Sequence, residues 1–93
     1  MSQLRVAVSG VGSLGQHHAR IAAGSEWATL VAVVDPDEAR GRAVAERFGT
    51  RWISDLDAVL PEVDAVQVAA PTGAHHAIGQ AVLRSGKHIL MEK

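Results

Sequence analysis

The sequence predicts an α/β protein in which five parallel strands form a doubly wound sheet with helices on both faces. Short apolar runs alternate with helical patterns, the connections between them are short, and the apolar residues are mostly Val, Ala, Leu and Ile. Parallel sheets covered on both faces favour such aliphatic and β-branched residues. Right-handed crossovers then give, most simply, the strand order 3-2-1-4-5.

The apolar runs are the expected strands, and they lie at residues 4–9, 30–34, 51–53, 64–70 and 87–91. The run at 30–34 is continuously apolar, which is typical of a central strand buried on both faces. The run at 51–53 is short, which favours a place at the edge of the sheet.

The segments between the strands are the expected helices, at residues 13–23, 36–48, 54–60 and 71–85. A glycine follows the first, second and fourth of them and stops each helix, whereas Pro61 breaks the third. Ala43 in the second helix and Leu83 in the fourth are expected to face the sheet.

The composition excludes several classes of protein. Ninety-three residues make one small domain, and nine basic against ten acidic residues, without clustering, give no electrostatic footprint for nucleic acid or an anionic membrane. There is no cysteine and no apolar run long enough to span a membrane, and the N-terminus leads directly into a strand rather than a signal peptide. We therefore expect a cytoplasmic protein.

Three glycines in a G-x-G-x-x-G turn follow the first strand and open the first helix. Gly10 lets the chain turn off the strand, Gly12 has no Cβ to keep the backbone away from a pyrophosphate, and Gly15 lets the helix pack closely on the strand. The amides that begin this helix, including those of Ser13 and Leu14, point with the positive end of the helix dipole at a phosphate. These residues are predicted to bind a dinucleotide.

Asp35 ends the second strand, twenty residues beyond the glycine turn. An acid at this distance accepts hydrogen bonds from the hydroxyls of an adenosine ribose and repels a 2′-phosphate, so it favours NAD over NADP. Arg40 and Arg42, early in the second helix, could approach a 2′-phosphate and would favour NADP. An arginine on an exposed helix is ordinarily a solvated residue, and we therefore expect NAD.

The carboxyl ends of the strands converge on one crevice between strands one and four, where the winding of the sheet reverses. The glycine turn, Asp35, the loop Ala70-Pro71-Thr72 and the pair Glu92-Lys93 all fall on that edge. All of these segments are candidates for one binding site.

The combination resembles the N-terminal Rossmann domain of the glucose-fructose oxidoreductase / inositol dehydrogenase / MocA family of NAD(P)-dependent oxidoreductases. The matching pieces are Gly10 to His18, Val33-Val34-Asp35, Ala70-Pro71-Thr72-Gly-Ala-His75 and Gly86 to Lys93, and the resemblance extends over nearly the whole chain. The last piece is similar to the family's strand-five signature, which ends in Glu-Lys-Pro.

The resemblance implies a role for several residues. Lys93 would reach the nicotinamide end of the site and act as the catalytic residue, beside a histidine and an aspartate from a second domain. The loop Ala70-Pro71-Thr72 would lie against the cofactor, with Thr72 where the family commonly has Asn. His75 either contacts the cofactor or substrate or caps and packs the start of the fourth helix. Glu92 is expected at the cofactor site, where it would orient its neighbours. No metal site is expected, since the adjacent His17 and His18 project about 100 degrees apart on a helix.

Three functions remain open at this point. Residues 1–93 are expected to be the cofactor half of an oxidoreductase that moves a hydride between nicotinamide and a sugar, polyol or related hydroxyl compound, with the C-terminal substrate domain absent from this chain. Alternatively, the chain is a stand-alone dinucleotide-binding or sensing module, whose bare strand-five edge would be covered by homo-oligomer formation. A sheet that binds S-adenosylmethionine is the third interpretation, which the three-glycine spacing disfavours.

Overall fold

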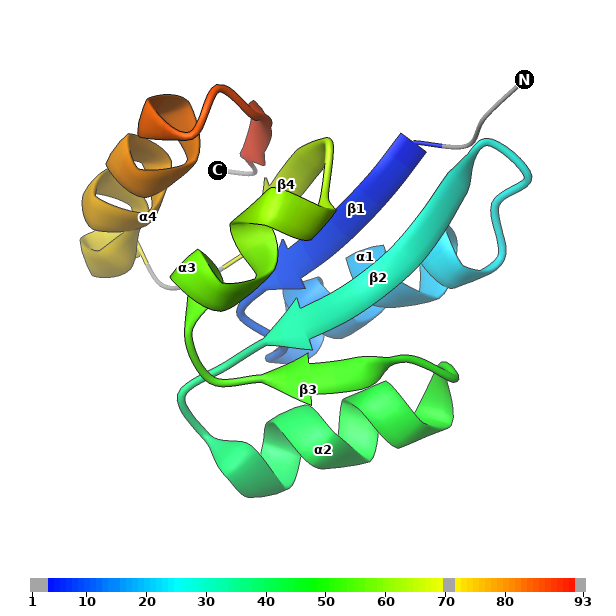
Figure 1. The fold of residues 1–93 in the computed structure, drawn as a ribbon. Coiled ribbons are helices and arrows are strands. Elements are labelled where there is room, and N and C mark those ends of the chain that lie inside the picture. The colour runs from blue at the N-terminus through cyan, green and yellow to red at the C-terminus, as the bar shows by residue number, and fades with distance from the viewer. Residues whose placement is uncertain (1–3, 70–71, 92–93) are drawn as a thin grey trace.

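The computed structural model describes residues 4–69 and 72–91, with the backbone alone for Ser13, for 72–77 and for 90–91. Five parallel strands form its sheet (Figure 1): β1 (Leu4–Ser9), β2 (Ala28–Val34), β3 (Arg51–Ile53), β4 (Ala65–Val68) and β5 (His88–Met91). The strand order is β3-β2-β1-β4-β5, which confirms the order predicted from the sequence.

Helices connect successive strands: α1 (Ser13–Ala23), α2 (Glu38–Arg47), α3 (Leu56–Val59) with the 3-10 turn η1 (Leu60–Glu62), and α4 (Thr72–Arg84). Figure 1 shows α1 behind β1 and β2 and α3 in front of them, so the sheet has helices on both faces. Among the described residues, no helix has the length and apolar character required to cross a bilayer.

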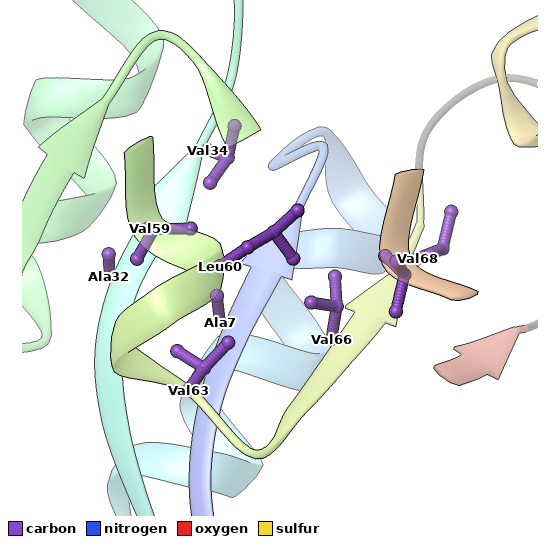
Figure 2. Packing of buried hydrophobic residues seen from close by; sticks show 9 residues of the cluster. Ala7, Ala32, Val34, Val59, Leu60, Val63, Val66 and Val68 are labelled. Carbon is purple, nitrogen blue, oxygen red and sulfur yellow. The ribbon is translucent and has the colours of Figure 1, made fainter. Parts of the chain in front are cut away.

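One half of the core lies under α3, η1 and α4. Strand residues alternate between the two faces, and those that point to this side are Ala7, Ala32, Val34, Val66 and Val68. Figure 2 shows Val59, Leu60 and Val63 lying over them. The other half lies under α1 and α2 and is formed by Val8, Val11, Ala19, Val33, Val44 and Ala45. Two aliphatic layers therefore pack against the two faces of the sheet and hold the ends of its strands in place.

The element bounds differ from the predicted ones at a few positions. β2 begins at Ala28 rather than at residue 30, because Ala28 and Thr29 pair with Leu4 and Arg5 of β1. Pro61 does not simply break the third helix, since it stands at the start of η1, where its missing N–H costs no hydrogen bond. The chain thus continues as a 3-10 turn.

Two side chains that were expected to face the sheet are exposed. Leu83 is 66% exposed, and Ala43 is also exposed, whereas its neighbours Val44 and Ala45 are buried. The buried residues of α2 are Gly41, Val44 and Ala45. The indole of Trp52 packs on Gly41.

Candidate functional site

The glycine turn lies where β1 ends, between the ends of β2 and β4. The N–H of Gly10 donates to Val34 of β2 over 2.7 Å, and the N–H of Ala69 donates to Ser9 over 2.9 Å. Gly10 has a φ of 88°, a conformation that side chains disfavour. Gly10 is therefore required by the turn itself, as the sequence predicted.

Gly15 and Gly12 are glycines for different reasons. A Cβ on Gly15 would lie 1.7 Å from the carbonyl oxygen of Gly10, so only glycine allows α1 to approach the turn this closely. A Cβ on Gly12 would meet nothing within 4 Å, and its φ of −68° suits any residue. The fold does not need a glycine at position 12, and the open space beside it is where a bound group could approach the backbone.

The start of α1 presents backbone amides at this turn. Gly12 is the N-cap and provides no side-chain cap, and Gln16 is the residue whose N–H bonds to the Gly12 carbonyl, over 2.9 Å. The amides of the first turn that precede Gln16 have no acceptor within the helix, which is the general property of a helix N-terminus. Together with the helix dipole they favour an anion at this point.

Asp35 is the buried carboxylate of the site and has no exposed surface. Its Oδ2 accepts the N–H of Val11 over 2.8 Å, and its Oδ1 accepts the N–H of Asp37 over 2.8 Å. The bond to Val11 ties the end of β2 to the middle of the glycine turn. The two predicted parts of the site are thus one hydrogen-bonded unit.

Arg40 closes the remaining side of this carboxylate. Its Nη2 lies 3.0 Å from Oδ1 and 3.1 Å from Oδ2 of Asp35, and its Nε lies 3.2 Å from Oδ2. The interpretation of Arg40 as an ordinary solvated residue is wrong, because its guanidinium forms a two-pronged ion pair with the buried acid. By contrast, Arg42 is 65% exposed and pairs with Glu38 on the same helix.

The electrostatics of Asp35 follow from these contacts. Burial by itself raises the pKa of a carboxyl group, because it disfavours the charged form. The hydrogen bonds from Arg40 and from the two backbone N–H groups outweigh burial, and the pKa of Asp35 lies below its usual value. The group is therefore a carboxylate at neutral pH.

The start of α2 explains why Arg40 is placed over Asp35. Asp37 is the N-cap of the helix, and its side chain accepts the N–H of Arg40 over 3.1 Å. Arg40 therefore stands in the first helical turn, which lies next to the end of β2. An acid at a strand end, an N-cap two residues later and an arginine three residues beyond that cap are the sequence signals that could have revealed this pair.

Trp52 is a further part of the site that the sequence did not reveal. Its Nε1 donates to the backbone carbonyl of Asp35 over 2.8 Å. The indole packs directly on Gly41, where an added Cβ would lie 2.1 Å from Cδ1, and the Arg42 guanidinium lies 5.0 Å from its ring centroid. We call Asp35, Arg40 and Trp52 the Asp35 cluster.

The structure brings together part of the predicted site. The six residues of the turn, Asp35 and the end of β4 lie at one edge of the sheet. Thr72 and His75 lie in the first turns of α4 by their backbone, and their side chains are outside the described residues. The predictions for Ala70, Pro71, Glu92 and Lys93 also lie outside the described residues.

Histidines and acids do not gather into a metal centre in the described part of the chain, where no three metal-ligating side chains lie close enough to hold an ion. His17 is exposed and its Nδ1 lies 3.0 Å from Nη2 of Arg20. The ring of His18 lines a shallow apolar hollow of about 50 Å³ with Val8 and Trp27. Both histidines are on α1, beyond the last glycine of the turn.

A comparison with protein families decides the assignment. Residues 4–93 match the model of the GFO_IDH_MocA oxidoreductase family, whose matching part is described as an NAD-binding Rossmann fold. The chain belongs to this family. The membership confirms the resemblance inferred from the sequence and favours a nicotinamide dinucleotide over S-adenosylmethionine.

Individual relatives agree with this membership. The chain is 39% identical to UDP-N-acetylglucosamine 3-dehydrogenase of Acidithiobacillus ferrooxidans, over 100% of the chain and 29% of that protein. It is 41% identical to inositol 2-dehydrogenase 1 of Saccharopolyspora erythraea, over 97% of the chain and 28% of that protein. The chain therefore spans less than a third of the length of the curated relatives that it matches.

A solved structure extends the similarity to the cofactor. GenD2 from gentamicin A biosynthesis, in complex with NAD, superposes with a TM-score of 0.95 at 38% identity, over 100% of this chain and 27% of that one. The residues of this chain fit such a group, since Gly12 leaves open space beside the first backbone amides of α1 and Asp35 is an ionised carboxylate. NAD is the cofactor of the fold to which this chain belongs.

Proposed function

We propose that residues 1–93 are the dinucleotide-binding domain of a dehydrogenase or reductase that moves a hydride between NAD and a sugar, polyol or related hydroxyl compound. The observation that carries this proposal is the bond of 2.8 Å between the N–H of Val11 and Oδ2 of Asp35. This bond holds a turn suited to a pyrophosphate next to an acid suited to a ribose. The adenosine diphosphate part of NAD contains both groups, so a site for it needs the turn and the acid side by side.

The turn and the acid divide the recognition of the cofactor between them. The amides at the start of α1, from Gly12 and Ser13 to Leu14 and Gly15, would donate to the pyrophosphate, which gains from the positive helix end. Asp35 would accept hydrogen bonds from the adenosine ribose. Against a 2′-phosphate the same carboxylate is repulsive, which makes NAD the favoured cofactor and NADP the less favoured one.

The remaining candidate site residues are assigned roles in the same proposed enzyme. Ala70, Pro71, Thr72, His75 and Glu92 would border the cofactor, and Lys93 would stabilise charge at the reacting hydroxyl or relay its proton. The names of the relatives, an inositol 2-dehydrogenase and a nucleotide-sugar 3-dehydrogenase, support a hydroxyl compound as substrate. A C-terminal domain that holds this substrate is part of the proposal.

The proposal also covers the partners of the protein and its location in the cell. We propose a small-molecule enzyme of the cytoplasm that binds neither nucleic acid nor membranes, because its charges are balanced and it has no cysteine that would need an oxidising compartment. Homo-oligomer formation through the edge of β5 would belong instead to a stand-alone dinucleotide-binding module, in which that strand offers backbone groups for pairing.

A substitution at Gly12 tests the cofactor site without disturbing the fold. In Gly12→Ala the new Cβ meets nothing in the protein but would occupy the space next to the pyrophosphate. We expect the affinity for NAD⁺, measured by titration calorimetry, to fall by at least about tenfold, with an unchanged melting temperature.

Gly24→Ala is the matched control, because its Cβ would make only an ordinary contact of 3.5 Å at the far end of the same helix. This variant should bind NAD⁺ as the wild type does. Equal affinities of the Gly12→Ala variant and the wild type would place the pyrophosphate elsewhere and refute the proposed site.

A further inference from the structure

Arg40 lies between the buried acid of the site and the solvent. Its side chain is 46% exposed, whereas the side chain of Asp35 beneath it has no exposed surface. Nη2 of the guanidinium contacts both carboxylate oxygens, and Nε contacts Oδ2, at 3.0 to 3.2 Å. Any group that approaches Asp35 from solvent on this side meets Arg40 first.

The carboxylate of Asp35 has no acceptor site to spare. A carboxylate offers about four lone-pair positions. Val11 donates to Oδ2 and Asp37 to Oδ1, and Arg40 takes the remaining position on each oxygen, through Nη2 at Oδ1 and through Nε and Nη2 at Oδ2. Ribose hydroxyls can therefore bond to Asp35 only in place of the guanidinium.

We propose that Arg40 is a displaceable guard of the ribose subsite and the residue that sets how strongly the protein discriminates between NAD and NADP. This role rests on the proposed function, because it concerns the same cofactor. Binding of NAD has to break the Asp35–Arg40 ion pair before the two hydroxyls can replace it. Part of the binding free energy is used in that exchange.

The same displacement acts in the opposite sense on NADP. A 2′-phosphate would lie against Asp35, which repels it, but the guanidinium beside it offers a fork of donors that matches a phosphate. Arg40 thus weakens the binding of NAD and strengthens the binding of NADP. Arg40 therefore reduces the difference in affinity between NAD and NADP that Asp35 creates.

Arg42 shows what a neighbouring arginine without this role looks like. It lies on the same helix, pairs with Glu38 over 2.6 Å and covers the ring of Trp52. In the described part of the chain its hydrogen bond is to Glu38 and not to Asp35, so its removal leaves the carboxylate and its four acceptor positions as they are. Arg42→Met is accordingly the matched control for Arg40→Met.

The test is a comparison of four proteins by calorimetric titration with NAD⁺ and with NADP⁺: the wild type, Arg40→Met, Arg40→Lys and Arg42→Met. We expect Arg40→Met to bind NAD⁺ about tenfold more tightly and NADP⁺ about tenfold more weakly. Arg40→Lys keeps the charge over Asp35 but loses the fork, so it should show a smaller change in the same directions. Arg42→Met should match the wild type for both cofactors.

A spectroscopic signature separates displacement from a purely structural role. In the wild type without added cofactor, the Nε–H of Arg40 bonds to Asp35, and its proton should exchange slowly with water in a nitrogen-resolved nuclear magnetic resonance spectrum. Saturation with NAD⁺ should abolish that protection. This measurement needs no variant, so it tests the displacement of Arg40 even if Arg40→Met does not fold.

The outcomes distinguish the guard from the proposed function. Binding of NAD⁺ by the wild type together with equal or weaker binding by Arg40→Met, or protection that persists at saturation, overturns the guard and leaves the proposed function standing. Absence of NAD⁺ binding by the wild type and by both Arg40 variants overturns both. Binding by the variants alone supports the guard in its strongest form.

Discussion

The glycine turn and the Asp35 cluster lie at the ends of the neighbouring strands β1 and β2, yet they are made of different parts of the chain. The turn consists of consecutive residues from Gly10 to Gly15, and it works through backbone amides and through the absence of side chains. The Asp35 cluster consists of three side chains from the end of β2, from α2 and from β3. One half of the site is local in the sequence and the other is tertiary.

This difference teaches how each half withstands change. A turn built from backbone tolerates almost no added atom where helix and turn touch, because the backbone cannot move aside. A cluster built from side chains can exchange one partner for another, as long as the buried charge keeps enough hydrogen bonds. The first half should therefore fail abruptly on substitution, and the second should respond in graded steps.

The largest effect is expected from Gly15→Ala, which breaks the turn. The added Cβ would lie 1.7 Å from the carbonyl oxygen of Gly10, so α1 has to move away from the turn. We expect the free energy of unfolding in urea to fall by about 4 to 5 kcal/mol, the range of severe single substitutions. Gly12→Ala is the control, and its free energy of unfolding should lie within about 0.5 kcal/mol of the wild-type value. Equal losses in the two variants would show that the contact between α1 and the glycine turn is not rigid.

A smaller loss is expected from Asp35→Ala, which breaks the Asp35 cluster. The N–H groups of Val11 and Asp37 lose their acceptor, and Arg40 loses its counter-charge. Unpaired buried donors cost about 1 to 3 kcal/mol, so the free energy of unfolding should fall by about 2 to 3 kcal/mol. In the variant Asp35→Ala/Arg40→Met, which also removes the stranded cation, part of that loss should return, and a further loss instead would contradict the graded response.

The smallest expected effect is a pH dependence of stability, in which the buried Asp35 is compared with Asp64, whose side chain is 35% exposed. Arg5 donates to Asp64 through its side chain and its N–H and lowers the pKa of Asp64 to about 2. A carboxyl group whose pKa is lowered on folding stabilises the protein above its unfolded pKa of about 4 and loses that contribution as the pH falls through the folded value. The pKa of Asp35 is lowered too, so both acids act in the same direction.

Urea unfolding between pH 6 and pH 2 measures this contribution. Asp64→Asn should be less stable than the wild type at pH 6, and the difference should shrink as the pH falls from about 4 towards about 2. A difference that stays constant down to pH 2 would mean that the ion pair with Arg5 does not form in solution. The exposed position of the pair makes this the mildest of the changes.

The backbone half of the site could be predicted because its cause is local. A positive φ at Gly10 and a close approach at Gly15 each require glycine at a fixed position, and the motif shows all three glycines at once. The strand order followed from equally general rules of handedness and connection. These features do not depend on which side chain meets which across the fold.

The side-chain half could not be predicted in the same way. Arg40 looks like an exposed helix residue until the N-cap at Asp37 fixes where the first turn of α2 lies relative to β2. Trp52 is seventeen residues from Asp35, and only the pairing of β3 with β2 brings the indole to that carbonyl. The same indole packs on Gly41, which is buried while Ala43 of the same helix is exposed.

The position of Trp52 gives the protein an intrinsic optical probe of its own binding site. The emission of an indole depends on its hydrogen bond and on nearby charges, and this ring is bonded to the backbone of Asp35 with a guanidinium 5.0 Å from its centroid. The other tryptophan, Trp27, is 58% exposed at the opposite end of the sheet and should be indifferent to events there. Fluorescence of a Trp27→Phe variant would therefore report on a single corner of the molecule.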